Sequence, residues 1–227
     1  SLNNAREVLA FTDEQSDIEH VEQQLPNERL IFLRRVLFEV FDFKDLYHLI
    51  ETVQGLVKQA TSFNQVETIP YLGGVGEQLA HLHQVGESFQ RQIHTILLGE
   101  PMDMEYLKER LHAAYVWFEQ QVSTLLQTIN DSPAYTDNKD DAKGYQEKME
   151  ELYVSLSRKL HLMKHLSDVP SVEKYFEARS KFRAPSVKIV VQGTEINSNM
   201  KQSEHPVLLR RLFGLRKQLA EEKGVEP

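Results

Sequence analysis

His161 and His165 are the pair of side chains in this sequence that most resembles a metal site. A spacing of four residues places both imidazoles on one face of a helix, as in helices that bind zinc. The three residues between them do not include the glutamate that follows the first histidine of a zinc-protease helix. His81 and His83 are two residues apart, and such residues face apart on a helix. We expect surface or boundary histidines and no bound metal.

Asp137, Asp140 and Asp141 form an acidic group that could be compared with a calcium loop. Lys139 stands where such a loop needs an oxygen ligand, and no glycine follows at the required offset. Helix capping before Ala142 is the simpler interpretation.

The glycine cluster Gly73-Gly74-Val75-Gly76 precedes a predicted helix, whose N-terminus could hold an anion. The cluster lacks the Lys-Ser/Thr ending of a phosphate-binding loop and the spacing of a dinucleotide fingerprint. We interpret it as a flexible connection between helices. No nucleophile, base and orienting acid can be linked by their spacing either, so we expect neither an enzyme nor a cofactor in this chain.

Cations gather on one short predicted helix near the end of the chain, at Arg210, Arg211, Arg216 and Lys217. Contact with the phosphates of a nucleic acid is the functional interpretation of this group. The alternative is a solvated helix face, because Glu221 and Glu222 follow closely.

The composition limits the classes of protein that remain. The 227 residues carry a formal net charge of −8, which argues against a protein whose whole surface binds DNA, so any such contact is local. The absence of cysteine excludes zinc ribbons, iron–sulfur clusters and disulfides. No apolar stretch is long enough to span a bilayer and no signal peptide opens the chain, so we expect a cytoplasmic protein. Because the chain begins at Ser1 instead of Met, we expect a part of a longer protein.

Apolar residues at spacings of three and four predict three long amphipathic helices. They run from Val75 to Ile96, from Met104 to Ile129 and from Tyr145 to Leu166, with Asp103 as a cap of the second. Gly99 and Pro101 separate the first two, and a polar connection over 130–144 precedes the third. These patterns predict an all-α protein in which the long helices form an antiparallel bundle.

The flanking segments complete the predicted organisation. Residues 30–43 form a central helix buried on several sides, 46–57 a further helix, and 13–24 a weaker, polar one. Residues 171–183 form a short helix, and the β-branched run 187–191 forms one short strand or an extended arm near 186–192. We divide the chain into an N-terminal helical segment (1–70), the bundle (71–184), an arm and polar linker (185–204), and a last helix (205–227).

The tail from Leu212 to Pro227 reads LFGLRKQLAEEKGVEP. It resembles the opening helix of an HRDC domain, the helicase and RNase D C-terminal module, in which a Leu-Arg-Lys helix is followed by a glycine-containing turn and a proline. The resemblance covers about the last 20 residues and implies that an auxiliary nucleic-acid-binding domain begins here.

A second resemblance covers residues 104–166. Its residues are Arg110-Leu111, Ala114-Tyr115, Phe118, Thr136-Asp137-Asn138-Lys139, Glu151-Leu152-Tyr153 and Lys159. They are similar to the helical region between the motor and the HRDC domain in a group of RecD-like bacterial helicases. The resemblance implies a piece of such a helicase without its ATP-binding motor, which would belong to the parent protein.

The function that we expect is a non-catalytic accessory module of a bacterial DNA helicase. In this hypothesis the bundle is a spacer or docking platform, and the last helix begins a nucleic-acid-binding domain. Its partners would be the parent motor and DNA, but no membrane. The alternative, favoured by the acidity, is a helical protein-interaction adaptor with no nucleic-acid role.

Overall fold

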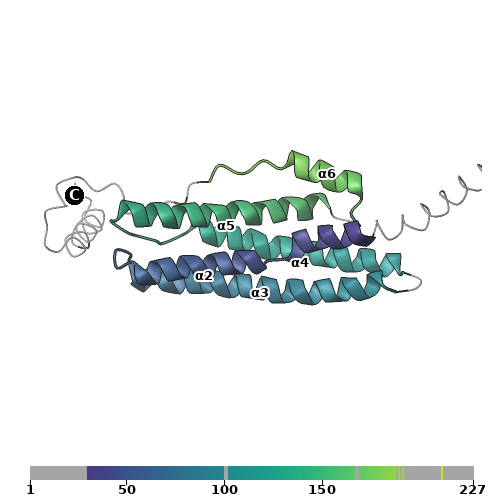
Figure 1. The fold of residues 1–227 in the computed structure, drawn as a ribbon, viewed down its shortest axis with the longest axis horizontal. Helices are drawn as coiled ribbons and strands as arrows, with labels where there is room; N and C mark the ends of the chain where they lie inside the picture. Colours follow the sequence, from purple (N-terminus) through teal and green to yellow (C-terminus); the bar gives the residue numbers. More distant parts are fainter. Residues whose placement is uncertain are drawn as a thin grey trace, which may run out of the picture.

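A computed structural model of the chain describes residues 30–99, 102–166 and 169–187, together with Ile189, Val191 and Arg211. The described part is an elongated all-α bundle (Figure 1), as the hydrophobic periodicity predicts. Its long helices are α2 (Lys44–Gln59), α3 (Gln65–Leu97), α4 (Met104–Asn130) and α5 (Lys139–His165). Because the connections between them are short, neighbouring helices run antiparallel. α2 packs on α3 and α5, and α4 packs on the same two helices.

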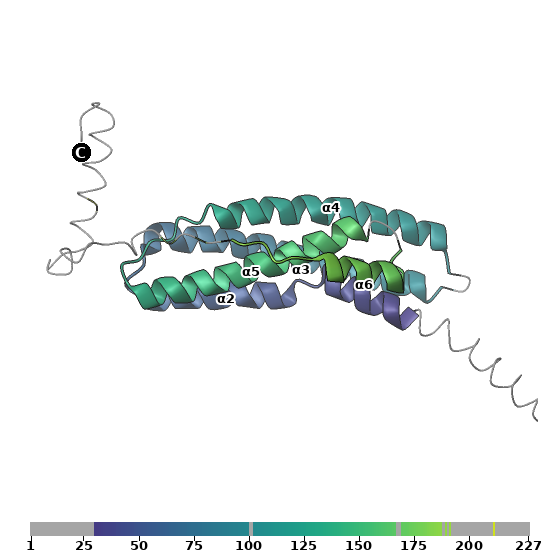
Figure 2. The same ribbon diagram turned by 90° about the horizontal axis from the view of Figure 1, so that it is seen from above.

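A helical segment over residues 30–41 precedes α2 and continues along the same side of the bundle (Figures 1 and 2). The two are separated at Asp42 and Phe43, where the Asp42 carboxylate accepts a hydrogen bond from the backbone N–H of Lys44 at 2.9 Å. The segment buries one face and not the several sides that we predicted, because its buried apolar residues are spaced three and four apart (Leu33, Val36, Leu37, Val40 and Phe41). Ile31 and Phe38 are not part of this face, since about half of each side chain is exposed.

α3 corrects our interpretation of the glycine cluster, because residues 73–76 lie inside this helix and not in a connection. The helix begins ten residues before Val75 and runs without interruption through residues 70 and 71. Two glycines of α3 face the preceding helical segments: Gly76 faces α2, and Gly86 faces the end of the segment 30–41. A Cβ at Gly76 would lie 2.8 Å from Nε2 of Gln54, and one at Gly86 would lie 2.3 Å from the carbonyl oxygen of Phe41. Glycine at these positions therefore allows α3 to approach its neighbour closely.

The starts of α4 and α5 follow from capping side chains. Asp103 accepts a hydrogen bond from the backbone N–H of Tyr106, as predicted. Asn138 accepts from the backbone N–H groups of Asp140 and Asp141, so α5 begins six residues before the predicted Tyr145.

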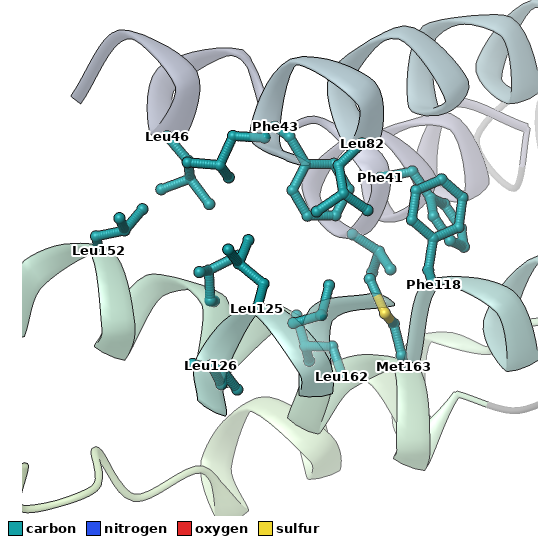
Figure 3. Close-up of a cluster of buried hydrophobic side chains, with 14 of the residues drawn as sticks. Phe41, Phe43, Leu46, Leu82, Phe118, Leu125, Leu126, Leu152, Leu162 and Met163 are labelled. Atoms are coloured by element: carbon teal, nitrogen blue, oxygen red, sulfur yellow. The ribbon is translucent and has the colours of Figure 1, made fainter. Parts of the chain in front are cut away.

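The core contains a cluster of aromatic rings where the first helical segment meets α3 and α4 (Figure 3 shows Phe41, Phe43 and Phe118). The Phe41 ring centroid lies 4.9 Å from that of Phe89 and 5.0 Å from that of Phe118. Phe43 stacks on Phe118 with centroids 5.6 Å apart. Leucine and methionine side chains of α4 and α5 continue the same apolar core along the bundle.

α6 (Val172–Lys181) lies outside the bundle of α2 to α5 and packs against α5 and residues 30–41 (Figure 2). Beyond it, residues 182–187 are in neither helix nor strand, and the chain runs back along α5. The N–H of Ile189 donates to the Glu150 carboxylate at 3.3 Å, and the side chains of Ile189 and Val191 are buried. The described residues of this stretch therefore correspond to the predicted extended arm. The predicted helix at 13–24 and, apart from Arg211, the predicted last helix at 205–227 lie outside the described residues.

None of the described helices is both long and apolar enough to cross a membrane.

Candidate functional site

His161 and His165 lie side by side on α5, with ring centroids 4.0 Å apart. Nε2 of His161 is 2.9 Å from the carbonyl oxygen of Ala178, so this ring joins α5 to α6. Nδ1 of His165 is 2.8 Å from the carbonyl oxygen of His161. His161 is half-buried and His165 is exposed, which confirms boundary and surface positions. Within the described ranges, no three His, Asp or Glu side chains are placed to hold a metal ion together.

The acidic group at 137–141 belongs to the start of α5. Asp140 and Asp141 lie in the first helical turn, where carboxylates interact favourably with the helix dipole. The cap itself is their neighbour Asn138. Asp141 also accepts a 2.6 Å hydrogen bond from the Ser62 hydroxyl, which ties the α2–α3 connection to α5. The acidic group therefore belongs to a helix start, as predicted, but the residue that caps the helix is Asn138.

Of the predicted phosphate-binding residues, only Arg211 belongs to the described residues, and its side chain is exposed. Arg210, Arg216 and Lys217 lie outside them. The proximity of these four cations in space therefore stays a prediction.

Where α6 lies on the bundle, its polar side chains meet one from the first helical segment. The Tyr175 hydroxyl donates a hydrogen bond to the Glu39 carboxylate and accepts one from Nη1 of Arg179 at 3.1 Å. The ring of Tyr175 also packs edge-on against Phe32, with centroids 5.6 Å apart. Burial is the main cause that raises the pKa of Tyr175, and the hydrogen bond to Glu39 raises it further. We call Glu39, Tyr175 and Arg179 the α6 seam.

Lys159 lies next to the α6 seam. Its ammonium donates to the carbonyl oxygen of Glu39 at 2.5 Å and lies 5.2 Å from the centroid of the Phe43 ring. Burial lowers the pKa of Lys159 to about 8, because the charged form loses hydration, although the carboxylates of Asp42, Glu39 and Asp45 oppose this effect. The lysine thus joins α5 to residue 39 and compensates part of the negative charge there.

The three side chains of the α6 seam hydrogen-bond to one another, so the seam joins α6 to the first helical segment. Sequence reasoning did not find it, since Glu39 and Tyr175 are separated by 136 residues and no local spacing connects them. Lys159 was among the residues of the helicase resemblance, but without a role. The one signal that the sequence offered for this contact was Tyr175 in the predicted short helix at 171–183.

The sequence matches the family described as the DNA helicase middle domain over residues 24–190. The chain belongs to this DNA helicase middle-domain family. The match to the middle domain covers the bundle, α6 and part of the arm, whereas residues 210–217 lie beyond it. No curated protein and no solved structure matches significantly. The middle domain is thereby placed among helical modules of DNA helicases.

Proposed function

We propose that this middle domain is a non-catalytic accessory module that holds an auxiliary DNA-binding domain or a partner protein at a set place relative to the motor of a bacterial DNA helicase. The observation that carries the proposal is the coincidence of the family match with one continuous structural unit. Residues 24–190 include α2 to α6, and these helices share one hydrophobic core. A continuous core resists bending, so it transmits position and orientation between the segments at its ends.

The path of the chain supports a spacer role. Phe32, at the start of the described residues, contacts Tyr175 of α6, which follows the end of α5. Ile189, in the arm, contacts Glu150 in the first half of α5. The helix between Glu150 and His165 is about 22 Å long at 1.5 Å per residue. The segments that precede and follow the module therefore join it at separated places.

The tail carries the second part of the proposal. From Leu212 it resembles the opening helix of an HRDC domain, and we assign phosphate contacts to Arg210, Arg211, Arg216 and Lys217. Such contacts position a protein on DNA without reading its bases. In this proposal the RecD-like motor, with its own phosphate-binding loop for ATP, belongs to the parent protein.

A protein-interaction adaptor is the second candidate, and exposed apolar side chains favour it. Ile31 and Phe38 are seven residues apart and therefore share a face of the first helical segment, and they are 55% and 48% exposed. Phe38 borders a small apolar hollow with Phe89, Ile93 and Leu97 of α3. Exposed apolar groups that lie together are a feature of surfaces that bind proteins.

The test uses the full-length helicase that contains this module. Phe118→Asp places a charge in the core, and Val116→Asp places the same charge two residues away on an exposed position. We expect Phe118→Asp to reduce DNA unwinding strongly while ATP hydrolysis stimulated by single-stranded DNA continues, because the motor itself is unchanged. Val116→Asp should unwind like the wild type.

Two outcomes would reject the spacer role. The first is a parallel loss of ATP hydrolysis and unwinding in Phe118→Asp, which would make the module part of the motor. The second is restoration of unwinding by the separate 227-residue chain added in trans, because a spacer acts only within the chain that it connects.

A further inference from the structure

Planar and cationic side chains gather where α5 meets the residues that follow α6. The guanidinium carbon of Arg158 lies 5.3 Å from the centroid of the Phe182 ring. The His161 ring is 5.4 Å from the same ring and 4.0 Å from that of His165. Lys181 and Arg183 are exposed beside Phe182. We call this group the α5–α6 basic surface, and it consists of Arg158, His161, His165, Lys181, Phe182 and Arg183.

The α5–α6 basic surface lies in a part of the chain where cations outnumber acids, although the whole chain is acidic. The whole sequence has 34 Asp and Glu residues against 26 Lys and Arg residues. Between positions 158 and 183 this balance is reversed. Seven cations stand there (Arg158, Lys159, Lys164, Lys174, Arg179, Lys181 and Arg183) against three acids (Asp168, Glu173 and Glu177). Three of these cations already face acids, because Lys159 lies beside Glu39, Lys164 pairs with Glu119 and Lys181 pairs with Glu177. Arg158 and Arg183 are the cations of this surface that remain for an anionic partner.

Two arginines of this surface keep much of their capacity to donate hydrogen bonds. Among the described residues, neither Arg158 nor Arg183 forms an ion pair. Arg183 donates through Nη1 to the carbonyl oxygens of Ser180 and Phe182 at 2.7 and 3.0 Å, which leaves its other N–H groups available. Lys181 differs, because it pairs with Glu177 at 2.5 Å.

Proteins that bind single strands combine cations, which contact the phosphates, with planar side chains on which bases stack. The α5–α6 basic surface has both features in one place. We propose that it binds single-stranded nucleic acid, with Arg158 and Arg183 on the phosphates and the exposed His165 ring beside a base. This inference rests on the proposed function, since a helicase module works next to single-stranded DNA. A contact of this size gives weak affinity, on the order of 10⁻⁴ to 10⁻⁶ M at physiological salt.

The experiment measures the binding of fluorescently labelled oligothymidine to the 227-residue chain by anisotropy, at about 50 mM and about 200 mM salt. The test variant carries Arg158→Gln and Arg183→Gln. The control variant carries Lys58→Gln and Lys108→Gln, which removes the same charge from exposed positions on α2 and α4. We expect the test variant to bind about tenfold more weakly at low salt and to lose about 1.4 from its salt slope, at about 0.7 per phosphate contact. The control should bind nearly as the wild type does, and thermal melts should show that both variants fold.

A third variant, in which Arg210, Arg211, Arg216 and Lys217 become Gln, separates this surface from the tail. We expect it to keep most of the affinity of the isolated chain. The proposal is overturned if the tail variant alone abolishes binding, if the test and control variants weaken equally, or if the wild type does not bind at low salt. Equal affinity for an abasic oligonucleotide of the same length would also overturn it, because bases would then contribute nothing.

The failure of this inference and the failure of the spacer role are distinguishable. The spacer role predicts a loss of unwinding when the core is disrupted, whether or not the α5–α6 basic surface binds DNA. The binding experiment requires no motor and no unwinding.

Discussion

The α2–α5 core and the α6 seam hold this molecule together in different ways. Each long helix buries a continuous apolar stripe, and α4 alone has nine buried residues. α6 buries only Tyr175 and Ala178 among its ten residues, and polar contacts join it to Glu39 and His161. A buried leucine or phenylalanine contributes about 1.5–3 kcal/mol, whereas a hydrogen bond contributes about 0.5–1.5 kcal/mol net. The comparison teaches that changes in the core act on the whole fold and changes at the seam act locally.

The largest expected effect comes from Phe118→Asp in the core. Phe118 is 1% exposed and contacts the rings of Phe41 and Phe43. An unpaired carboxylate at this position costs several kcal/mol, against a total stability of about 5–15 kcal/mol. We expect a loss of the cooperative thermal transition and of most of the helical circular dichroism.

Val116→Asp is the control for this substitution. Val116 is 56% exposed on the same helix, so its change should leave the melting temperature within a few degrees of that of the wild type. If Phe118→Asp melts as the wild type does, the packing of α4 described above is wrong.

Gly86→Ala tests the close approach of α3 to the first helical segment, with a smaller expected effect. The new Cβ would lie 2.3 Å from a backbone oxygen of Phe41, which can move away only if a helix shifts. We expect a loss of about 2–3 kcal/mol in the free energy of unfolding, as in other overpacked cores. Urea denaturation measures it.

Gly73→Ala, in the same helix, is the matched control and should stabilise the protein where Gly86→Ala destabilises it. Nothing lies within 4 Å of a Cβ at Gly73, so the better helix propensity of alanine should stabilise the protein by up to about 1 kcal/mol. Equal effects of the two substitutions would show that helix propensity, and not the contact with Phe41, decides the requirement for glycine.

The smallest effect is expected at the α6 seam. Tyr175→Phe keeps the ring against Phe32 and removes the hydroxyl that joins Glu39 to Arg179. We expect a loss of about 1 kcal/mol, confined to α6. Hydrogen exchange should become faster at the amides of 175–181 and remain unchanged in α3 and α4.

Tyr106→Phe, at a tyrosine that is 49% exposed on α4, is the matched control. It should leave hydrogen exchange unchanged in every helix. A global loss of stability in Tyr175→Phe would remove the distinction between core and seam, because α6 would then belong to the cooperative unit.

Sequence alone determined the helices with regular apolar stripes. The spacing of Leu107, Leu111 and Phe118 predicted the buried face of α4, and Asp103 marked its start. These features depend on neighbours three or four residues apart, so local periodicity contains them. The all-α class followed for the same reason.

The tertiary structure decided what depends on residues far apart in the sequence. The glycines at 73, 74 and 76 predict a break when only neighbours are considered, but α3 continues through them, and Gly76 allows a close approach to α2. Glu39 and Tyr175 form a contact only because α6 folds back onto the first helical segment. Arg158 lies over the Phe182 ring only through the same fold, since 24 residues separate them in the sequence. Local patterns specify helices. The contacts between helices depend on the shape and charge of side chains that are far apart in the sequence.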